Sequence, residues 1–222
     1  MIDFSPLWIS LKTGIVATLI SFFLGIYVAY YVAKAKPVTK ALADGIMTMP
    51  LVLPPTVAGF LLLYVFSLRR PVGSFLYETM DIKVVQTWVG CILAATVIAF
   101  PLMYRNALGA FEQVDKNLIY AARTLGMSER EIFWRVVVPA AKPGILSGTI
   151  LTFARALGEY GATSMLAGNI AGKTGTISQK IAMVIQDGDY ETAGFWVLII
   201  VGISFFIVLF MNLVTMGRRR GK

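Results

Sequence analysis

The chain has 222 residues, of which 57% are hydrophobic and 14% are charged, and its mean hydropathy is +0.74. Soluble domains carry about 25% charged residues, so this composition predicts an integral membrane protein. The chain has no histidine and one cysteine, Cys91, which excludes a disulfide framework, a histidine metal site and a histidine general base, and topology and anionic lipid explain the net charge of +8 without nucleic acid.

Five apolar segments are long enough to cross about 30 Å of hydrocarbon as helices. They lie at residues 7–33, 42–67, 86–108, 144–166 and 194–215. Residues 177–185 are apolar on one face but too short to span, so we expect a helix at the outer membrane surface. The odd number of spans puts the termini on opposite sides. Without linkers or repeats, we expect one domain, 7–215, and a basic cytoplasmic tail, 216–222.

The second span is interrupted by Pro50, Pro54 and Pro55, each of which lacks a backbone donor. Broken helices persist in a membrane where protein or a water-filled cavity satisfies the freed carbonyls. The segment is either a kinked packing helix or part of a translocation path, with Pro54, Pro55 and Thr56 as candidate pathway residues. Pro101 in the third span leaves the same two interpretations.

The segment 115–139 begins as an amphipathic helix. Its apolar residues recur at helical spacing, namely Leu118, Ala121, Ala122 and Leu125. Gly126 then supplies a helix stop that tolerates positive φ. The following segment predicts a second short helix.

Ser128 and Glu131 form a predicted capping box at the start of this second helix. An apolar face follows before Pro139. Two short helices that meet at a glycine form a compact knob that could fit into a groove of another protein. The alternative is an ordinary cytoplasmic loop that rests on the membrane surface.

The spacing of this segment resembles the EAA loop of ABC-importer permeases, in which E-A-A is followed after three residues by Gly and after nine more by I-x-L-P. Tyr120 stands at the Glu position, and Val136 and Val138 stand at the Ile and Leu positions. The resemblance implies a loop that couples the membrane domain to an ATPase. Its coupling residues would be Tyr120, Ala121, Ala122, Gly126, Val136 and Pro139.

The fourth span contains two ionisable residues, Arg155 and Glu159, at i and i+4 spacing. Charged groups inside a membrane face the bundle interior or an aqueous cavity. The pair is therefore either a neutralised structural contact or a lining or gate of the path. Gly158 and Gly161 beside it permit close helix approach, so Gly161 joins the candidate gate residues.

Residues 167–174, AGNIAGKT, are similar to a phosphate-binding G-x-x-x-x-G-K-[ST] loop, with Ala167 at the first glycine position. Such a loop needs a preceding β-strand, whereas this one follows a membrane span. We expect no nucleotide here, so any ATPase must be a separate chain.

Lys and Arg residues set the predicted orientation. If the 115–139 loop is cytoplasmic, thirteen of the 20 lie on that side and six on the other, with Arg155 in the fourth span. The N-terminus is then outside and the C-terminus cytoplasmic.

Longer segments extend the resemblance over nearly the whole chain. PLVLPPTVAGFLLLYVFSLRRPVGSFL, the AARTLG loop and FARALGEYGATSMLAGNIAGKTGTIS resemble the permeases of molybdate ABC importers, with the sulfate and thiosulfate permeases as close cousins. The resemblance implies an all-α type I permease of the bacterial inner membrane, paired with a second copy. Two ATPase subunits and an extracytoplasmic oxyanion-binding protein would complete the importer. The chain would bind no cofactor and catalyse no reaction, because ATP and Mg would belong to the ATPase.

The sequence gives weaker support to two other functional classes. An ion-coupled secondary transporter predicts several intramembrane carboxylates and an internal repeat, whereas the sequence has Glu159 alone in the interior of a predicted span and no clear repeat. A membrane enzyme predicts a catalytic constellation, and none is visible in the sequence.

Overall fold

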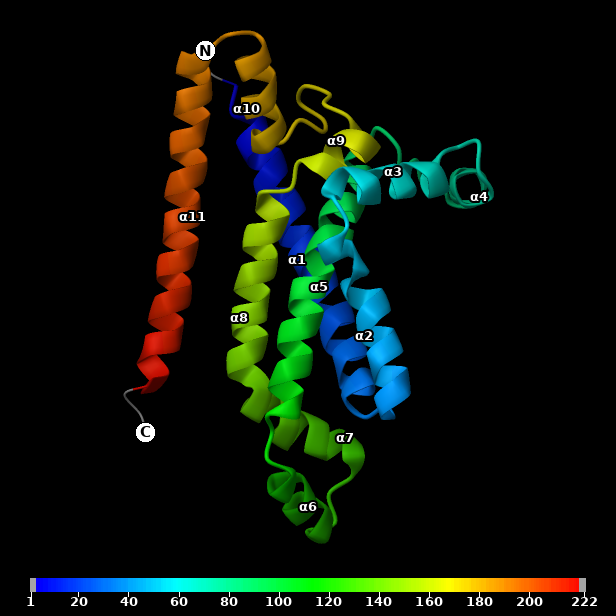
Figure 1. The fold of residues 1–222 in the computed structure, drawn as a ribbon, viewed down its shortest axis with the longest axis vertical. Helices are drawn as coiled ribbons and strands as arrows, with labels where there is room; N and C mark the ends of the chain where they lie inside the picture. The colour runs from blue at the N-terminus through cyan, green and yellow to red at the C-terminus, as the bar shows by residue number, and fades with distance from the viewer. Residues whose placement is uncertain (1–2, 220–222) are drawn as a thin grey trace.

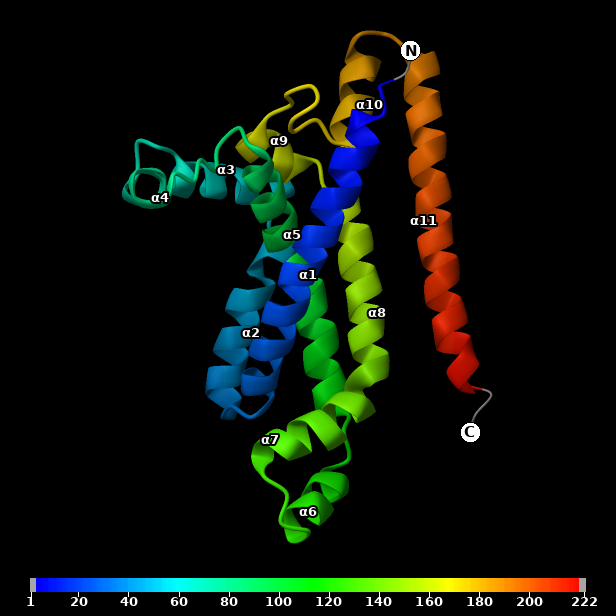
Figure 2. The same cartoon turned by 180° about the vertical axis from the view of Figure 1, so that it is seen from behind.

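Every regular element in the described part of the chain is a helix. The structure is a computed structural model that describes residues 3–219, apart from the side chains of residues 212 and 214–219. It is a bundle of long helices with shorter helices at both ends (Figures 1 and 2). In chain order the elements are α1 (Ser5–Ala33), α2 (Pro37–Val52), α3 (Pro55–Phe66), α4 (Pro71–Met80), α5 (Trp88–Glu112), α6 (Lys116–Thr124), α7 (Glu129–Ile132), a π-helical turn η1 (Phe133–Val137), α8 (Val138–Leu157), α9 (Gly161–Ala167), α10 (Ile177–Gln186) and α11 (Tyr190–Arg219).

Long apolar helices form the body of the molecule. Four described stretches can cross a membrane by length and composition, namely Ser5–Ala33, Trp88–Glu112, Glu129–Leu157 and Tyr190–Met211, and the bent pair α2–α3 makes a fifth if it counts as one span. The spans predicted at 7–33, 86–108 and 194–215 are thus confirmed as helices, with shifted ends. α5 packs against both α1 and α8 and forms the centre of the bundle.

The span predicted at 42–67 is present as a broken span, as its prolines predicted. α2 and α3 are separated by a break, and their axes are bent by 107°. Leu53 is extended, with φ −69° and ψ 141°, because a residue that precedes a proline disfavours the helical conformation. Pro54 is extended as well, with ψ 134°. α3 and α4 consequently turn away from the bundle axis (Figure 1).

The span predicted at 144–166 is displaced along the chain. α7, η1 and α8 run without interruption from Glu129 to Leu157. The chain then leaves the helix at Gly158 and starts α9 at Gly161. Hydropathy does not register this break, since the residues on both sides of it are apolar.

The helix predicted at 177–185 is present as α10, and part of it packs against the other helices of the bundle. Ile177, Gln179 and Val184 are buried, and α10 packs against α1 and α11. The backbone N–H of Ile177 donates to Oγ of Ser10 in α1, at 2.9 Å. In both views α10 follows the direction of α11 (Figures 1 and 2), and the burial of Ile177 and Val184 shows that protein covers one side of α10.

The two ends of the bundle differ in what they hold. α6 and α7 lie at one end, and α3, α4, α9 and α10 lie towards the other (Figure 1). α1 starts at the second end and α11 finishes towards the first, as the odd number of spans predicts. Residues 216–219 of the predicted tail continue α11, and residues 220–222 lie outside the described residues. The domain boundary 7–215 stays a prediction.

Candidate functional site

α6 is a short helix whose two ends are closed by its own sequence. At its start the Asp115 side chain accepts a hydrogen bond from the backbone N–H two residues later, at 2.9 Å. At its end Gly126 N–H donates to the carbonyl of Arg123 (2.9 Å) and Met127 N–H to that of Ala122 (3.2 Å), which is a Schellman motif. Gly126 has a φ of +76°, which glycine adopts without steric cost. The predicted helix stop at Gly126 is confirmed.

α6 has one apolar face towards the bundle and another towards the outside. Ala122 is 5% exposed and belongs to a buried apolar cluster against which Ile119 packs. Leu118, Tyr120 and Leu125 are 51%, 56% and 81% exposed. The residues predicted to share one face therefore lie on two faces. Ala122 points into the bundle, whereas Leu118, Ala121 and Leu125 are exposed. The inward face anchors the loop, and the outward face remains free for a partner.

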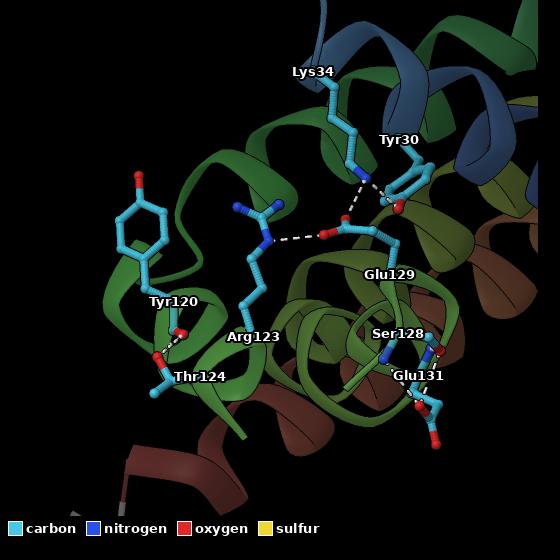
Figure 3. Close-up of polar contacts among 8 residues, drawn as sticks. All are labelled: Tyr30, Lys34, Tyr120, Arg123, Thr124, Ser128, Glu129 and Glu131. Atoms are coloured by element: carbon cyan, nitrogen blue, oxygen red, sulfur yellow. Dashed lines mark hydrogen bonds and ion pairs between the residues drawn. The ribbon is translucent and has the colours of Figure 1, made fainter. Parts of the chain in front are cut away.

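The second helix of the loop begins as predicted. Oγ of Ser128 accepts from the Glu131 N–H at 3.3 Å, and the Glu131 carboxylate accepts from the Ser128 N–H at 3.0 Å (Figure 3). The capping box is therefore confirmed. The cap fixes the first turn of α7 directly after the glycine at the end of α6.

Pro139 does not end this helix, contrary to the prediction of two short helices. It is the second residue of α8 and is exposed. The π-helical turn η1 precedes it, and Val138 N–H donates to the carbonyl five residues earlier. A proline ring inside an α-helix collides with the preceding turn. We therefore attribute the presence of Pro139 in a continuous helix to the wider π-helical turn before it. Val136 is partly buried against the cluster around Ala122. The loop is thus continuous with the long helix of α8.

Glu129 at the start of α7 links the loop to the end of α1. Its Oε1 accepts from Nε of Arg123 at 2.7 Å, and its Oε2 lies 3.4 Å from Nζ of Lys34, next to α1 (Figure 3). Lys34 also contacts the hydroxyl and the ring of Tyr30. The hydrogen bond from Arg123 to Glu129 raises the pKa of Arg123. Sequence reasoning missed this link, because partners 95 residues apart leave no spacing signal.

A second cluster lies where α8 ends and α9 begins. Glu159 is 2% exposed, and its Oε2 lies 2.7 Å from Nη1 of Arg155 in the last turn of α8. Its Oε1 accepts from the backbone N–H of Ala162 in α9 at 2.8 Å. The predicted pair is formed, but the prediction that both residues lie on one helix face is wrong, because α8 ends at Leu157. The carboxylate thereby joins two helices.

The start of α9 approaches the start of α3 closely. A Cβ on Gly161 would lie 3.0 Å from Cβ of Pro55 and 3.3 Å from N of Thr56. A Cβ on Gly59 would lie 2.7 Å from Cα of Ala162, so the backbones of α3 and α9 are in contact there. The break between α2 and α3 and the break between α8 and α9 therefore meet. Four of the predicted pathway residues, Pro55, Thr56, Gly161 and Glu159, lie in or next to this junction.

Three other positions were singled out in the sequence, namely Pro54, Pro101 and Gly158. Pro54 is exposed between α2 and α3. Pro101 is buried inside α5, which continues past it. An added Cβ on Gly158 would meet, within 4 Å, an atom of its own helix alone, so no neighbouring helix among the described residues approaches it. Pro101 is therefore covered by the bundle, and the close approach predicted at Gly158 is not formed among the described residues.

The chemistry available to the two clusters is non-covalent. In residues 3–219 no group of three or more His, Cys, Asp and Glu side chains is placed to hold a metal ion. The 167–174 loop follows the helix α9, and its Thr174 accepts from the N–H of Ile170 at 2.9 Å, so the loop folds on itself. The α6 surface can bind a protein, and the junction of helix breaks can shift between packings.

Known proteins resemble this chain over most of its length. Residues 21–220 match the family model of the binding-protein-dependent transport system inner membrane component. The molybdenum transport system permease protein ModB of Escherichia coli (strain K12) is 42% identical over 190 residues, which cover 84% of this chain and 83% of ModB. ModB of Haemophilus influenzae is 38% identical over 184 residues, with 83% and 80% covered. The sulfate transport system permease protein CysT of Salmonella typhimurium is 32% identical over 214 residues, with 96% and 76% covered.

The helix arrangement also matches a solved structure. A chain of the MetNI methionine ABC transporter in an inward-facing conformation aligns with a TM-score of 0.71 at 18% identity, and the alignment covers 95% of this chain and 94% of that one. At this identity the likeness concerns the fold alone. The family match includes α6, the capping box and both helix breaks. This chain belongs to the family of binding-protein-dependent transport system inner membrane components.

Proposed function

We propose that this chain is the permease subunit of an ABC importer for an oxyanion, molybdate in the first place and tungstate with it. The observation that carries the proposal is the exposed apolar face of α6, which the Schellman motif and the Glu129 link hold at one end of the bundle. The substrate follows from the relatives. Two named for molybdenum are 42% and 38% identical, whereas the sulfate permease is 32% identical.

In this proposal the chain works as a homodimer. Each copy offers one α6 to one of two ATPase subunits, which bind ATP and Mg, and an extracytoplasmic binding protein delivers the anion. Support for a second copy comes from α2, which has no buried residue within the chain. Its exposed apolar residues recur at helical spacing, namely Val38, Leu42, Ile46 and Met49. Membrane lipid surrounds the remaining faces, and nucleic acid has no role.

Transport then follows from switching between two packings. Closure of the ATPase pair moves the two α6 helices together, and because α7 continues through η1 into α8, the movement passes directly to a crossing helix. The far end of α8 carries Arg155, Glu159 and the contact between α3 and α9. We propose this junction as the gate region. The chain itself catalyses no reaction.

Sulfate or thiosulfate is the second candidate substrate. The match to CysT spans 96% of this chain, more than the match to either ModB protein reported above. A competition assay between molybdate and sulfate separates the two, because each importer discriminates through its own binding protein and path.

The proposed orientation puts α6 in the cytoplasm and α4 outside. In a Cys91→Ala background, Glu78→Cys in α4 should react with an impermeant thiol reagent added to intact cells. Asn117→Cys in α6 should react after the cells are permeabilised and not before. Both positions are exposed, so burial does not explain a difference. Reversed labelling would overturn the orientation and with it the docking role of α6.

Purification from native membranes tests the importer assignment against an ion-coupled carrier. The tagged permease, extracted in mild detergent, should bring down a soluble ATPase in equal amount. Transport by the permease purified as a single polypeptide would contradict the importer assignment.

A further inference from the structure

An apolar groove of about 520 Å³ runs between α1 and the helix formed by α7, η1 and α8. This volume lies within the range of small-molecule sites, about 300–1,000 Å³. Aromatic and aliphatic side chains from both helices line it, including Phe22, Phe23, Ile26, Tyr27, Trp134 and Val138. The groove therefore fits an apolar ligand.

The groove has the length of one membrane leaflet. Its lining on α1 extends from Phe22 to Tyr31, and the nine steps between these residues cover roughly 14 Å at a rise of about 1.5 Å per residue. This is about half of a hydrocarbon core of roughly 30 Å. The groove reaches the end of the bundle that holds α6, where α7 crosses below α1 and α8 (Figures 1 and 2). An extended chain lying along α1 would occupy a single leaflet.

A cation lies at the α7 end of this groove. Arg130 lines it and is exposed, and its side chain has no hydrogen-bond or ion-pair partner in the described part of the chain. The neighbouring Glu129 is already held by Arg123 and Lys34 (Figure 3), so it does not neutralise Arg130. A guanidinium matches phosphate geometry with two parallel hydrogen bonds. The groove thus offers an apolar wall and a phosphate partner at one site.

We propose that this groove binds one acyl chain of an anionic phospholipid, with the lipid phosphate on Arg130. The proposal rests on the proposed orientation, which places α7 at the cytoplasmic leaflet, where anionic lipids gather and basic pockets between helices bind their headgroups. Tyr27, Tyr30 and Tyr31 near the same end are typical of a membrane interface.

A second copy of the chain fits the groove less well, because it would have to supply a carboxylate for Arg130. The five side-chain carboxylates that the described residues place on the α6 side are already bonded within the chain, namely Asp44, Glu112, Asp115, Glu129 and Glu131. A lipid phosphate requires no such rearrangement.

Native mass spectrometry of the purified transporter tests the proposal. The assembly is titrated with phosphatidylglycerol and, separately, with phosphatidylethanolamine. We expect Arg130→Gln to weaken phosphatidylglycerol binding about fivefold, the contribution of one cation near an anionic surface, and Arg130→Lys to restore most of it. Arg135→Gln is the matched control, since Arg135 is exposed on η1 and does not line the groove. It should bind like the wild type.

The apolar wall is tested by Trp134→Ala, which should weaken binding of both lipids. Its control is Phe206→Ala, in an apolar groove between α1, α8 and α11. Equal losses in Arg130→Gln and Arg135→Gln, or no preference for phosphatidylglycerol, would overturn the proposal. A disulfide between copies that carry Tyr27→Cys and Trp134→Cys would also overturn it, because the groove would then be a subunit interface. Lipid binding is read without ATP, so failure here differs from failure of the importer proposal.

Discussion

Arg155→Met is expected to destabilise the protein by about 3–5 kcal/mol, because it leaves a buried carboxylate without its cation. Glu159 is 2% exposed, and Arg155 at 2.7 Å is its ion-pair partner among the described residues. Thermal unfolding of the detergent-purified protein should show a clearly lower midpoint. Glu159→Gln should cost less, since its side-chain oxygen can still accept from the Ala162 N–H while the partly exposed Arg155 reaches water.

The double variant Arg155→Met/Glu159→Gln removes both charges and keeps an acceptor for Ala162. We expect it to recover most of the stability and of the uptake. Arg155→Met/Glu159→Leu should recover less, because the Ala162 N–H loses its partner. We favour a structural pair that holds α8 to α9 within the proposed gate region, since the chain itself engages both oxygens of the carboxylate. A double variant that is stable and binds its ATPase, yet does not transport, would show instead that the pair serves the path.

Gly126→Val is expected to uncouple the permease from its ATPase. Gly126 has a φ of +76°, and a β-branched residue held there costs about 1–2 kcal/mol. An added Cβ meets nothing within 4 Å, so the cost is backbone strain rather than a clash. Because the strain opens the Schellman motif, we expect the last turn of α6 to fray and Leu125 to lose its position on the exposed face of α6. Association with the ATPase should weaken about five- to thirtyfold, which is the effect of 1–2 kcal/mol.

Gly126→Asn is the matched control, since asparagine tolerates the left-handed conformation. It should bind ATPase nearly as well as the wild type. Both variants should insert into the membrane equally, because α6 lies outside the crossing helices. Co-purification measured by band intensity checks both. Wild-type ATPase binding by Gly126→Val, with uptake intact, would remove α6 from the coupling role.

Local signals predicted the α6–α7 loop well. The turn at Gly126 and the capping box of Ser128 and Glu131 depend on residues close together in sequence, and both are formed. The position of Pro139 inside a continuous helix was not predictable from such local signals. A π-helical turn that makes room for a proline leaves no spacing pattern, so a continuous helix was interpreted as two.

Contacts between distant segments were predictable only in part. Hydropathy found the apolar segments, but it merged α8 with α9, because apolar residues continue across that break. The break between α2 and α3 was predictable from the prolines of the second span. The closeness of Gly161 to Pro55 and the link between Lys34 and Glu129 depend on tertiary packing. Composition explains why the chain lies in a membrane, and packing alone explains which of its breaks meet.

Uptake of labelled molybdate into proteoliposomes decides whether the chain is an ATP-driven oxyanion permease. The vesicles hold the permease with its ATPase, and the binding protein is supplied on the opposite side of the membrane. We expect uptake that requires ATP and the binding protein, is competed by tungstate, and is little affected by sulfate. Uptake by the permease without ATPase, driven by an ion gradient, would contradict the proposed function.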